Sequence, residues 1–344
     1  MTFDGPTPDN PLLSRPTIEG RDAADEVVTV SIGQPEAPSG LAINCNLGLG
    51  DAVHGYVQAG IAPATRRAYR ADLDHFRAWG GAIPATDDQL ASYLASHATT
   101  LKVATLARRL ATISAAHEAQ RLPNPVRSPL IRATMRGIRR ERGSGQRQAK
   151  PLLRDDLFAV LAATGSSLKD LRDRALLLIG FAGGFRRSEL CAINCDDVDR
   201  FRQGLAITLR RSKTDQDGVG RKIGIPLGRS KWCPVAALER WLQAVGIEDG
   251  PVFRRVDRHG RVSAERLSAE AVCLVVRERV VAAGYDPTGY SGHSLRAGFA
   301  TSAAQAGVSL WRIRQQTGHA SDAMLARYIR DGELFIDNAA GALL

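Results

Sequence analysis

Tyr328, near the C-terminus, is the side chain of this chain best suited to act as a nucleophile. Two histidines, His293 and His319, and two arginines, Arg186 and Arg296, stand upstream of it in separate short motifs. An unperturbed phenol has a pKa of about 10, so it needs a proton acceptor or a cationic pocket to attack at neutral pH. Planar guanidinium groups present paired donors that match the oxygens of a phosphate group. The set therefore predicts attack on a phosphodiester rather than on an amide or an ester.

The distribution of charge indicates a polyanionic partner. The 344 residues carry a formal net charge of +10, which alone does not separate nucleic acid from an anionic membrane surface. Residues 1–48 hold seven acidic residues against two arginines, whereas residues 102–154 hold thirteen basic residues against two acidic ones. A merely solvated helical face is the alternative, but such a face would interleave acids to limit self-repulsion. We therefore expect double-stranded DNA to be the partner.

Length and periodicity predict two domains behind an N-terminal tail. A chain of 344 residues exceeds the usual size of a single domain. Residues 1–48 are acidic and proline-rich, which is typical of a disordered segment. Residues 49–142 show the helical spacing of apolar side chains and predict a small bundle. A joint rich in Gly, Ser and Gln over residues 143–150 then leads into a second domain over residues 151–344.

The bundle carries the side chains that we expect to contact DNA. Apolar residues at spacings of three and four define inward faces on helices predicted over residues 65–79 and 103–120, and a third helix over residues 128–142 is studded with arginine. Polar residues on these helices are expected to point outward and to enter the major groove or hold phosphates: Thr65, Arg66, Arg67, Arg70, Thr105, Arg108, Arg109, Arg136, Arg139 and Arg140.

The second domain is predicted to be mainly helical with one small antiparallel sheet. Strands over residues 205–209 and 222–226 bracket a turn that contains Lys213. Helices are expected near residues 154–163, 169–182, 234–245, 265–283, 294–306, 309–316, 321–329 and 333–343. The fold class is therefore mainly α, with a helical bundle followed by a helical domain that holds a small sheet.

Cysteine usage and hydropathy indicate an intracellular protein without a metal. Five scattered cysteines include no CxxC pair, which favours reduced thiols in the cytoplasm. Cys191 and Cys195 could share a helix face, but the nearby sequence lacks further zinc ligands. The chain shows neither a signal pattern nor an apolar run long enough to span a bilayer. It also lacks a P-loop and a two-metal carboxylate cluster, so no cofactor is expected.

Five motifs resemble the tyrosine recombinase family, also called the phage integrase family, and within it the Cre-like recombinases. They are GFRRSEL at residues 184–190, RSKT at 211–214, SGHSLR at 291–296, TGH at 317–319 and RYIR at 327–330. The resemblance runs from about residue 60 to the end of the chain. Each motif alone is weak, since a lone tyrosine or histidine is commonly a packing residue. The resemblance rests on all five motifs occurring in the order and at the separations that the family shows.

The resemblance implies a two-domain DNA clamp, with a SAM-like core-binding bundle and the tyrosine recombinase catalytic fold. It implies that Tyr328 attacks phosphorus while His293 accepts or positions the phenolic proton. Arg186, Arg296 and His319 would then donate to the nonbridging oxygens as charge builds on them.

Two further residues complete the implied site. Lys213 is the expected acid for the departing 5′ oxygen, and a phosphate-contacting surface lysine is the alternative. Glu189 follows Arg186 by one helical turn, so we expect it to orient that arginine rather than to touch the substrate.

The implied reaction is cleavage and rejoining of DNA through a covalent 3′-phosphotyrosine, without ATP or metal, in a homotetramer on paired inverted-repeat sites. The apolar residues after the tyrosine are expected to dock on a neighbouring protomer, and packing on their own domain is the alternative: Leu334, Phe335, Ile336, Leu343 and Leu344. Three rivals remain: a type IB topoisomerase-like enzyme that relaxes supercoils, a catalytically silent DNA-binding protein, and a transcription regulator that uses the helical bundle alone.

Overall fold

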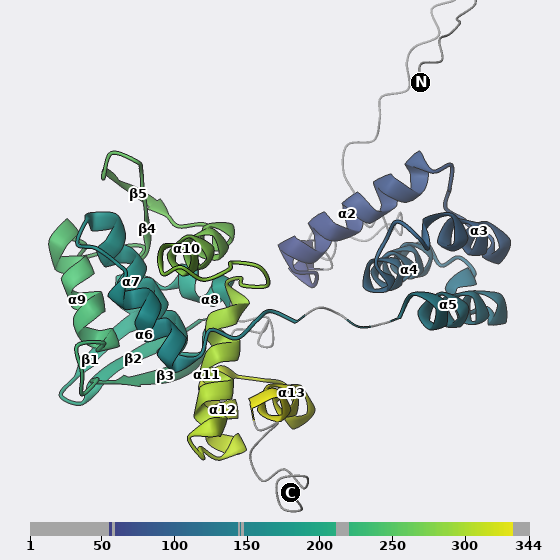
Figure 1. Ribbon diagram of the computed structural model, residues 1–344. Coiled ribbons are helices and arrows are strands. Elements are labelled where there is room, and N and C mark those ends of the chain that lie inside the picture. Colours follow the sequence, from purple (N-terminus) through teal and green to yellow (C-terminus); the bar gives the residue numbers. More distant parts are fainter. Residues whose placement is uncertain (1–54, 57–58, 144, 146–147, 211–219, 333–344) are drawn as a thin grey trace, which may run out of the picture.

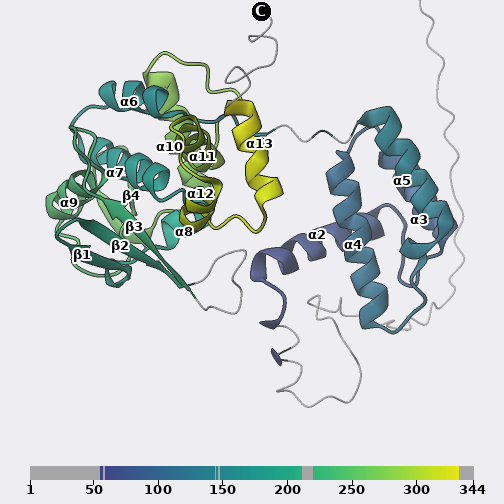
Figure 2. The same cartoon turned by 90° about the horizontal axis from the view of Figure 1, so that it is seen from below.

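The chain folds into two bodies that are joined by the segment after helix α5 (Figures 1 and 2). The computed structural model describes residues 55–56, 59–143, 145, 148–210 and 220–332. Each body has its own buried apolar core. Among the described residues, no helix has the length and apolar character needed to cross a bilayer.

The first body is a helical bundle, in which the described residues from Pro63 onward form four α-helices. Its helices are α2 (Pro63–Ala78), α3 (Asp87–His97), α4 (Val103–Ala119) and α5 (Pro129–Arg142), with a 3₁₀ turn η1 (Pro125–Arg127) before α5. Side-chain caps set two of the starts, because Thr86 accepts from the amide of Gln89 and Ser128 accepts from the amide of Ile131. The predicted helices over residues 65–79, 103–120 and 128–142 are confirmed within one or two residues.

A buried polar network joins α2 to α4 inside the bundle. The carboxylate of Asp72, 2% exposed, accepts two hydrogen bonds from Arg108, at 2.8 and 2.7 Å. Arg109 lies 3.5 Å from the same carboxylate and donates to the Tyr93 hydroxyl at 2.8 Å. The expectation that Arg109 points outward to DNA is therefore wrong. Position 109 belongs to the inward stripe of α4, and the buried Asp72 compensates its charge.

Replacing Asp72 by alanine is expected to lower the free energy of unfolding by about 3 kcal/mol, because Arg109 would be left buried without its carboxylate. Urea denaturation followed by circular dichroism measures this loss. The matched control is Asp74→Ala, since Asp74 pairs with Arg77 on the surface of the same helix, where both side chains are more than half exposed. That change should cost less than about 1 kcal/mol. Equal losses for the two variants would contradict a stabilising role for the buried pair.

The second body is mainly helical and holds two small antiparallel sheets. Its helices are α6 (Arg154–Ala162), α7 (Leu168–Ala182), α8 (Arg187–Ala192), α9 (Pro234–Val245), α10 (Ala269–Ala282), α11 (His293–Gln305), α12 (Leu310–Thr317) and α13 (Asp322–Gly332), with a 3₁₀ turn η2 (Cys195–Asp197) after α8. The strands are β1 (Val198–Phe201), β2 (Gly204–Leu209), β3 (Arg221–Pro226), β4 (Arg254–Val256) and β5 (Val262–Arg266), in the orders β1-β2-β3 and β4-β5. The predicted fold class is confirmed.

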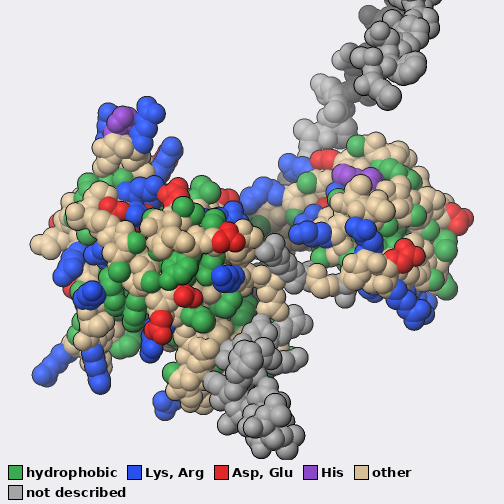
Figure 3. All heavy atoms as spheres, in the orientation of Figure 1, with side chains coloured by type: hydrophobic (Ala, Val, Ile, Leu, Met, Phe, Trp, Pro, Cys, Tyr) green, Lys and Arg blue, Asp and Glu red, His purple; other side chains and the backbone are tan. Residues whose placement is uncertain are grey.

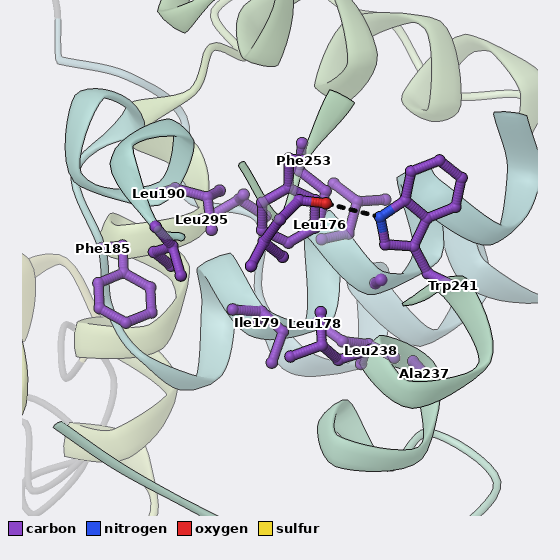
Figure 4. Close-up of a cluster of buried hydrophobic side chains, with 14 of the residues drawn as sticks. Leu176, Leu178, Ile179, Phe185, Leu190, Ala237, Leu238, Trp241, Phe253 and Leu295 are labelled. Carbon is purple, nitrogen blue, oxygen red and sulfur yellow. Dashed lines mark hydrogen bonds between the residues drawn. The ribbon is translucent and has the colours of Figure 1, made fainter. Parts of the chain in front are cut away.

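Helix α7 runs through the core of this body and packs against α9. Figure 4 shows side chains of α7, such as Leu176 and Ile179, beside Leu238 and Trp241 of α9. The indole of Trp241 is fully buried and donates to the carbonyl of Val252 at 2.8 Å. This buried centre carries the turn after α7, from which Arg186, the first of the predicted catalytic arginines, projects.

The β-structure differs from the sequence-based prediction in two places. Strand β1 and the β4-β5 hairpin were not predicted, because short strands with exposed polar residues lack a clear alternation. The helix expected from residue 265 begins instead at Ala269, where Ser268 caps it by accepting from the amide of Ala271. Residues up to Arg266 pair with β4, so tertiary pairing overrides the local helical pattern.

Helices α11, α12 and α13 form a small group at one edge of the second body (Figure 1). Ala300 and Ala304 of α11 bury against Ile313 of α12 and Leu325 of α13. Helix α13, which carries Tyr328, is therefore held against α11, which carries His293 and Arg296. The last predicted helix, over residues 333–343, and its expected docking side chains lie outside the described residues.

Candidate active site

The first arginine of the site projects from the turn between α7 and α8. Gly184 takes a left-handed φ of 57° there, which reverses the chain before Arg186. The amide of Arg186 donates to Glu189 at 2.9 Å, and its Nη1 donates to the other oxygen of the same carboxylate at 2.5 Å. Because the Glu189 side chain is only 2% exposed, its carboxylate fixes both the backbone and the guanidinium of Arg186.

The C-terminal end of α12 gathers three guanidiniums. Nη1 of Arg296 donates to the carbonyls of Gly184, at 2.8 Å, and Thr317. Nη2 of Arg186 donates to the carbonyl of Gly318 at 3.3 Å. Carbonyls at a helix C-terminus lack partners within the helix and lie at the negative end of its dipole, so they attract cations. The end of α12 therefore positions the arginines that face the site.

Arg221 is the third of these guanidiniums, and the sequence-based prediction missed it. From β3, it donates to the carbonyls of residues 315, 316 and 317 at 3.1 Å, and it lies 3.9 Å from Glu189. Gly318 has φ 65°, and a Cβ there would lie 2.6 Å from the Arg221 guanidinium carbon, so this close approach requires glycine. In the sequence, the one indication of a role for Arg221 in the site is its position on the predicted strand that follows Lys213.

Arg296 is buried, yet one of its donors has no protein partner. The residue is 1% exposed, and its Nη2 makes no hydrogen bond to any described residue. Burial, followed by the charge of Arg186, lowers the pKa of Arg296 to about 10, so the group stays protonated at neutral pH. An unsatisfied buried donor is unfavourable unless a ligand supplies the acceptor. An anion in this site would supply it.

The phenol of Tyr328 contacts the imidazole of His293. Its hydroxyl lies 2.6 Å from Nε2 of His293, the first residue of α11. His293 as a residue is exposed, but desolvation of its ring, and then the charges of Arg296 and Arg186, lower the pKa of His293. The imidazole is therefore neutral at neutral pH and able to accept the phenolic proton.

A second imidazole, that of His319, also lies beside the phenol. Its ring centroid is 5.6 Å from that of Tyr328, and its Nδ1 is 2.7 Å from the Thr317 hydroxyl. Burial, followed by the charges of Arg296 and Arg186, lowers the pKa of His319 to about 3. The folded protein therefore holds His319 as a neutral imidazole.

The lowered pKa of His319 makes stability depend on pH. The unfolded chain takes up a proton on this histidine below about pH 6.5, whereas the folded protein does not until about pH 3, so stability is lost as pH falls through this window. Between about pH 7 and about pH 5, the wild type should lose about 2 kcal/mol more than a His319→Gln variant. Urea unfolding at the two pH values measures it. Equal losses would show that His319 is not held neutral.

The structure brings together five of the six predicted catalytic side chains: Arg186, His293, Arg296, His319 and Tyr328. The sixth, Lys213, lies outside the described residues. Glu189 contacts Arg186, as its spacing predicted.

The predicted DNA-contacting side chains occupy the bundle. Six of the predicted arginines are exposed and form no ion pair with another described residue: Arg66, Arg67, Arg70, Arg136, Arg139 and Arg140. Thr65 is exposed, Thr105 is half-buried, and the guanidinium of Arg108 is occupied by Asp72. Figure 3 shows Lys and Arg side chains on the surfaces of both bodies. Contact of these residues with DNA stays a prediction.

In the described part of the chain, His, Cys, Asp and Glu side chains form no group of three or more that could hold a metal ion.

Comparison with known proteins identifies the family of this chain. The family model described as "Phage integrase family" matches residues 150–333. The "Integrase/recombinase xerD homolog" of Selenomonas ruminantium is 39% identical over 81% of this chain and 84% of its own length. "Recombinase cre" of Escherichia phage P1 is 29% identical over 76% of this chain and 80% of its own length.

Solved structures share the fold. XerH site-specific recombinase bound to a palindromic difH substrate aligns with a TM-score of 0.61 at 16% identity, over 85% of this chain and 83% of that chain. A lambda integrase dimer bound to a COC′ core site aligns with a TM-score of 0.60 at 21% identity, over 82% and 76%. With the family model, the curated relatives and the site geometry in agreement, the chain belongs to the phage integrase family of tyrosine recombinases, which are DNA strand-transferring enzymes.

Proposed function

We propose that this protein is a site-specific DNA recombinase that cleaves and rejoins duplex DNA through a covalent 3′-phosphotyrosine. The observation that carries the proposal is the Tyr328 hydroxyl, hydrogen-bonded to His293 at 2.6 Å beside the guanidiniums of Arg186 and Arg296. The pairing of a weak nucleophile with a neutral imidazole is the arrangement that activates a hydroxyl for attack.

In the first step, His293 takes the phenolic proton as the Tyr328 oxygen attacks phosphorus. The new bond is Tyr328 Oη to phosphorus, and the bond that breaks joins phosphorus to the 5′ oxygen of the next nucleotide. That oxygen must leave as a hydroxyl, and Lys213 is our candidate for the proton donor. Rejoining is the reverse, in which a 5′ hydroxyl attacks the phosphotyrosine.

Charge builds on the nonbridging oxygens as the phenolic oxygen approaches. Nη2 of Arg296, which has no protein partner, can donate a hydrogen bond to one of these oxygens. The guanidinium of Arg186 provides further donors. Both are fixed before substrate arrives, by the carbonyls of Gly184, Thr317 and Gly318. Donors that are already oriented need no reorganisation during the reaction. One phosphodiester replaces another, so the exchange needs no ATP.

Binding of duplex DNA would involve both bodies. We propose that residues 49–142 and 151–344 are two domains that grip the duplex, with residues 143–150 as the joint. The exposed arginines of α2 and α5 support this, because unpaired cations on one body can neutralise phosphates. Solved structures of this fold include a lambda integrase tetramer bound to a Holliday junction, with a TM-score of 0.57. We therefore propose a homotetramer on paired, inverted-repeat sites.

The test distinguishes recombination from relaxation of supercoils. Duplexes selected from a random pool by the non-cleaving Tyr328→Phe protein give the site, which is then placed once or twice in a supercoiled plasmid. With EDTA present, we expect two copies in direct repeat to yield two circles and one copy to yield no product beyond nicking. Relaxation of the one-site plasmid would instead favour a type IB topoisomerase-like enzyme. Loss of all products in EDTA would contradict the metal-free mechanism.

A further inference from the structure

Thr317 stands at the centre of the site without being one of its reactive groups. The residue is fully buried at the end of α12. Its carbonyl accepts from Arg296 and from Arg221. Its hydroxyl lies 2.7 Å from the carbonyl of Ile313 and 2.7 Å from Nδ1 of His319.

These two short distances decide which nitrogen of His319 carries the proton. A threonine hydroxyl has one hydrogen to donate, and a carbonyl oxygen can only accept. The hydroxyl therefore donates to Ile313, because the opposite choice would press two acceptors together at 2.7 Å. Its remaining lone pairs face His319, so Nδ1 must be the donor. In a neutral imidazole that leaves Nε2 without a hydrogen.

We propose that Thr317 is a positioning residue that holds His319 in the tautomer protonated on Nδ1, so that Nε2 meets the scissile phosphate as an acceptor and donates to it only after taking up a proton. This inference rests on the proposed function for the identity of the ligand, but the tautomer itself is a property of the free protein. The side-chain hydrogen bond of His319 among the described residues is made by Nδ1, so Nε2 is the ring nitrogen that remains for a ligand.

The surroundings explain why the proton arrives with the substrate. His319 faces Arg296 and His293 of α11, Arg186 before α8, Arg221 of β3 and Tyr328 of α13. Arg314 also donates to its backbone carbonyl, at 3.1 Å. Three nearby guanidiniums disfavour a further cation in the free site. A bound phosphodiester brings an anion that offsets them, so a proton from solvent can then settle on Nε2 and point at a nonbridging oxygen.

Nuclear magnetic resonance tests the tautomer directly, without DNA. With ¹⁵N-labelled histidine, long-range proton–nitrogen spectra report which ring nitrogen is protonated, and the His319→Gln spectrum assigns the signals. We expect wild-type His319 to carry its proton on Nδ1. Thr317→Ser, which keeps the hydroxyl, should keep this pattern, and Thr317→Val, which keeps the shape alone, should shift the proton to Nε2. An Nε2-protonated wild type, or an unchanged Val variant, would overturn the proposal.

Single-turnover cleavage of the selected site tests the consequence. Thr317→Val should cleave more slowly and Thr317→Ser should restore the rate. The ratio of the wild-type rate to the Thr317→Val rate should fall as pH rises from about 6 to about 8, because only the wild type must take up the proton. A ratio independent of pH would reduce Thr317 to a structural residue and overturn the proposal. If no variant cleaved any DNA, the proposed function would fail while the tautomer result stood.

Discussion

A Tyr328→Phe protein is expected to bind its site and to form no covalent adduct with DNA. The change removes one oxygen, the atom that would attack phosphorus, and leaves the ring packed beside the small cluster of α11, α12 and α13. Deleting a nucleophile in an enzyme with covalent catalysis lowers the rate by about 10⁶-fold. Denaturing electrophoresis of protein with an end-labelled, nicked duplex measures the adduct, and gel retardation measures binding.

The matched control for this prediction is Tyr285→Phe. Tyr285 is an exposed tyrosine that follows α10 in the same body. Its adduct should form at the wild-type rate. An adduct that survived in Tyr328→Phe would show that another residue attacks, and peptide mapping of the linkage would identify it.

An Arg296→Lys protein is expected to cleave about 10²–10³-fold more slowly, the size of effect found when one oriented donor to a developing oxyanion is removed. Lysine keeps the charge but has no planar fork, so it cannot hold the carbonyls of Gly184 and Thr317 and still reach the phosphate as Nη2 does. Binding should change little, because phosphate affinity is spread over many cations. Single-turnover cleavage under saturating protein measures the rate.

Loss of stability has to be separated from loss of catalysis in this variant. Arg279→Lys provides the control, since Arg279 is another largely buried arginine, which pairs with Asp173 at 2.6 Å and Asp170 at 2.6 Å. It should lower the unfolding midpoint and leave the cleavage rate of the folded protein unchanged. If Arg296→Lys cleaved at the wild-type rate, Arg296 would have no part in stabilising the transition state.

Much of the fold was predictable because periodic apolar spacing is a local signal. The helices over residues 65–79 and 103–120 were predicted from such spacing and lie within two residues of the expected bounds. The β4-β5 hairpin was not predictable, since its strands are short and its pairing depends on a partner elsewhere in the chain. The start of α10 moved to Ala269 for the same reason.

Charged residues on helices were harder to place than apolar ones. Arg108 and Arg109 are neighbours on α4, and their spacing alone left both as candidates for DNA contact. The fold buries Arg109 because α2 offers Asp72 at that point, whereas the arginines of α5 meet no carboxylate and stay exposed. A buried cation becomes tolerable only when a tertiary neighbour compensates it.

Motif order and residue type in the chain were sufficient to identify the reactive groups, because a phenol, imidazoles and guanidiniums each have a chemistry that does not depend on the fold. The fold alone assigned the distances, the protonation states and the supporting partners. The sequence did not reveal the supporting roles of Arg221 and Thr317. Their contacts at the end of α12 involve a backbone carbonyl and a hydroxyl, groups that every sequence contains. Convergence of segments more than a hundred residues apart, as between Arg186 and Gly318, removes water from the imidazoles and sets their charge.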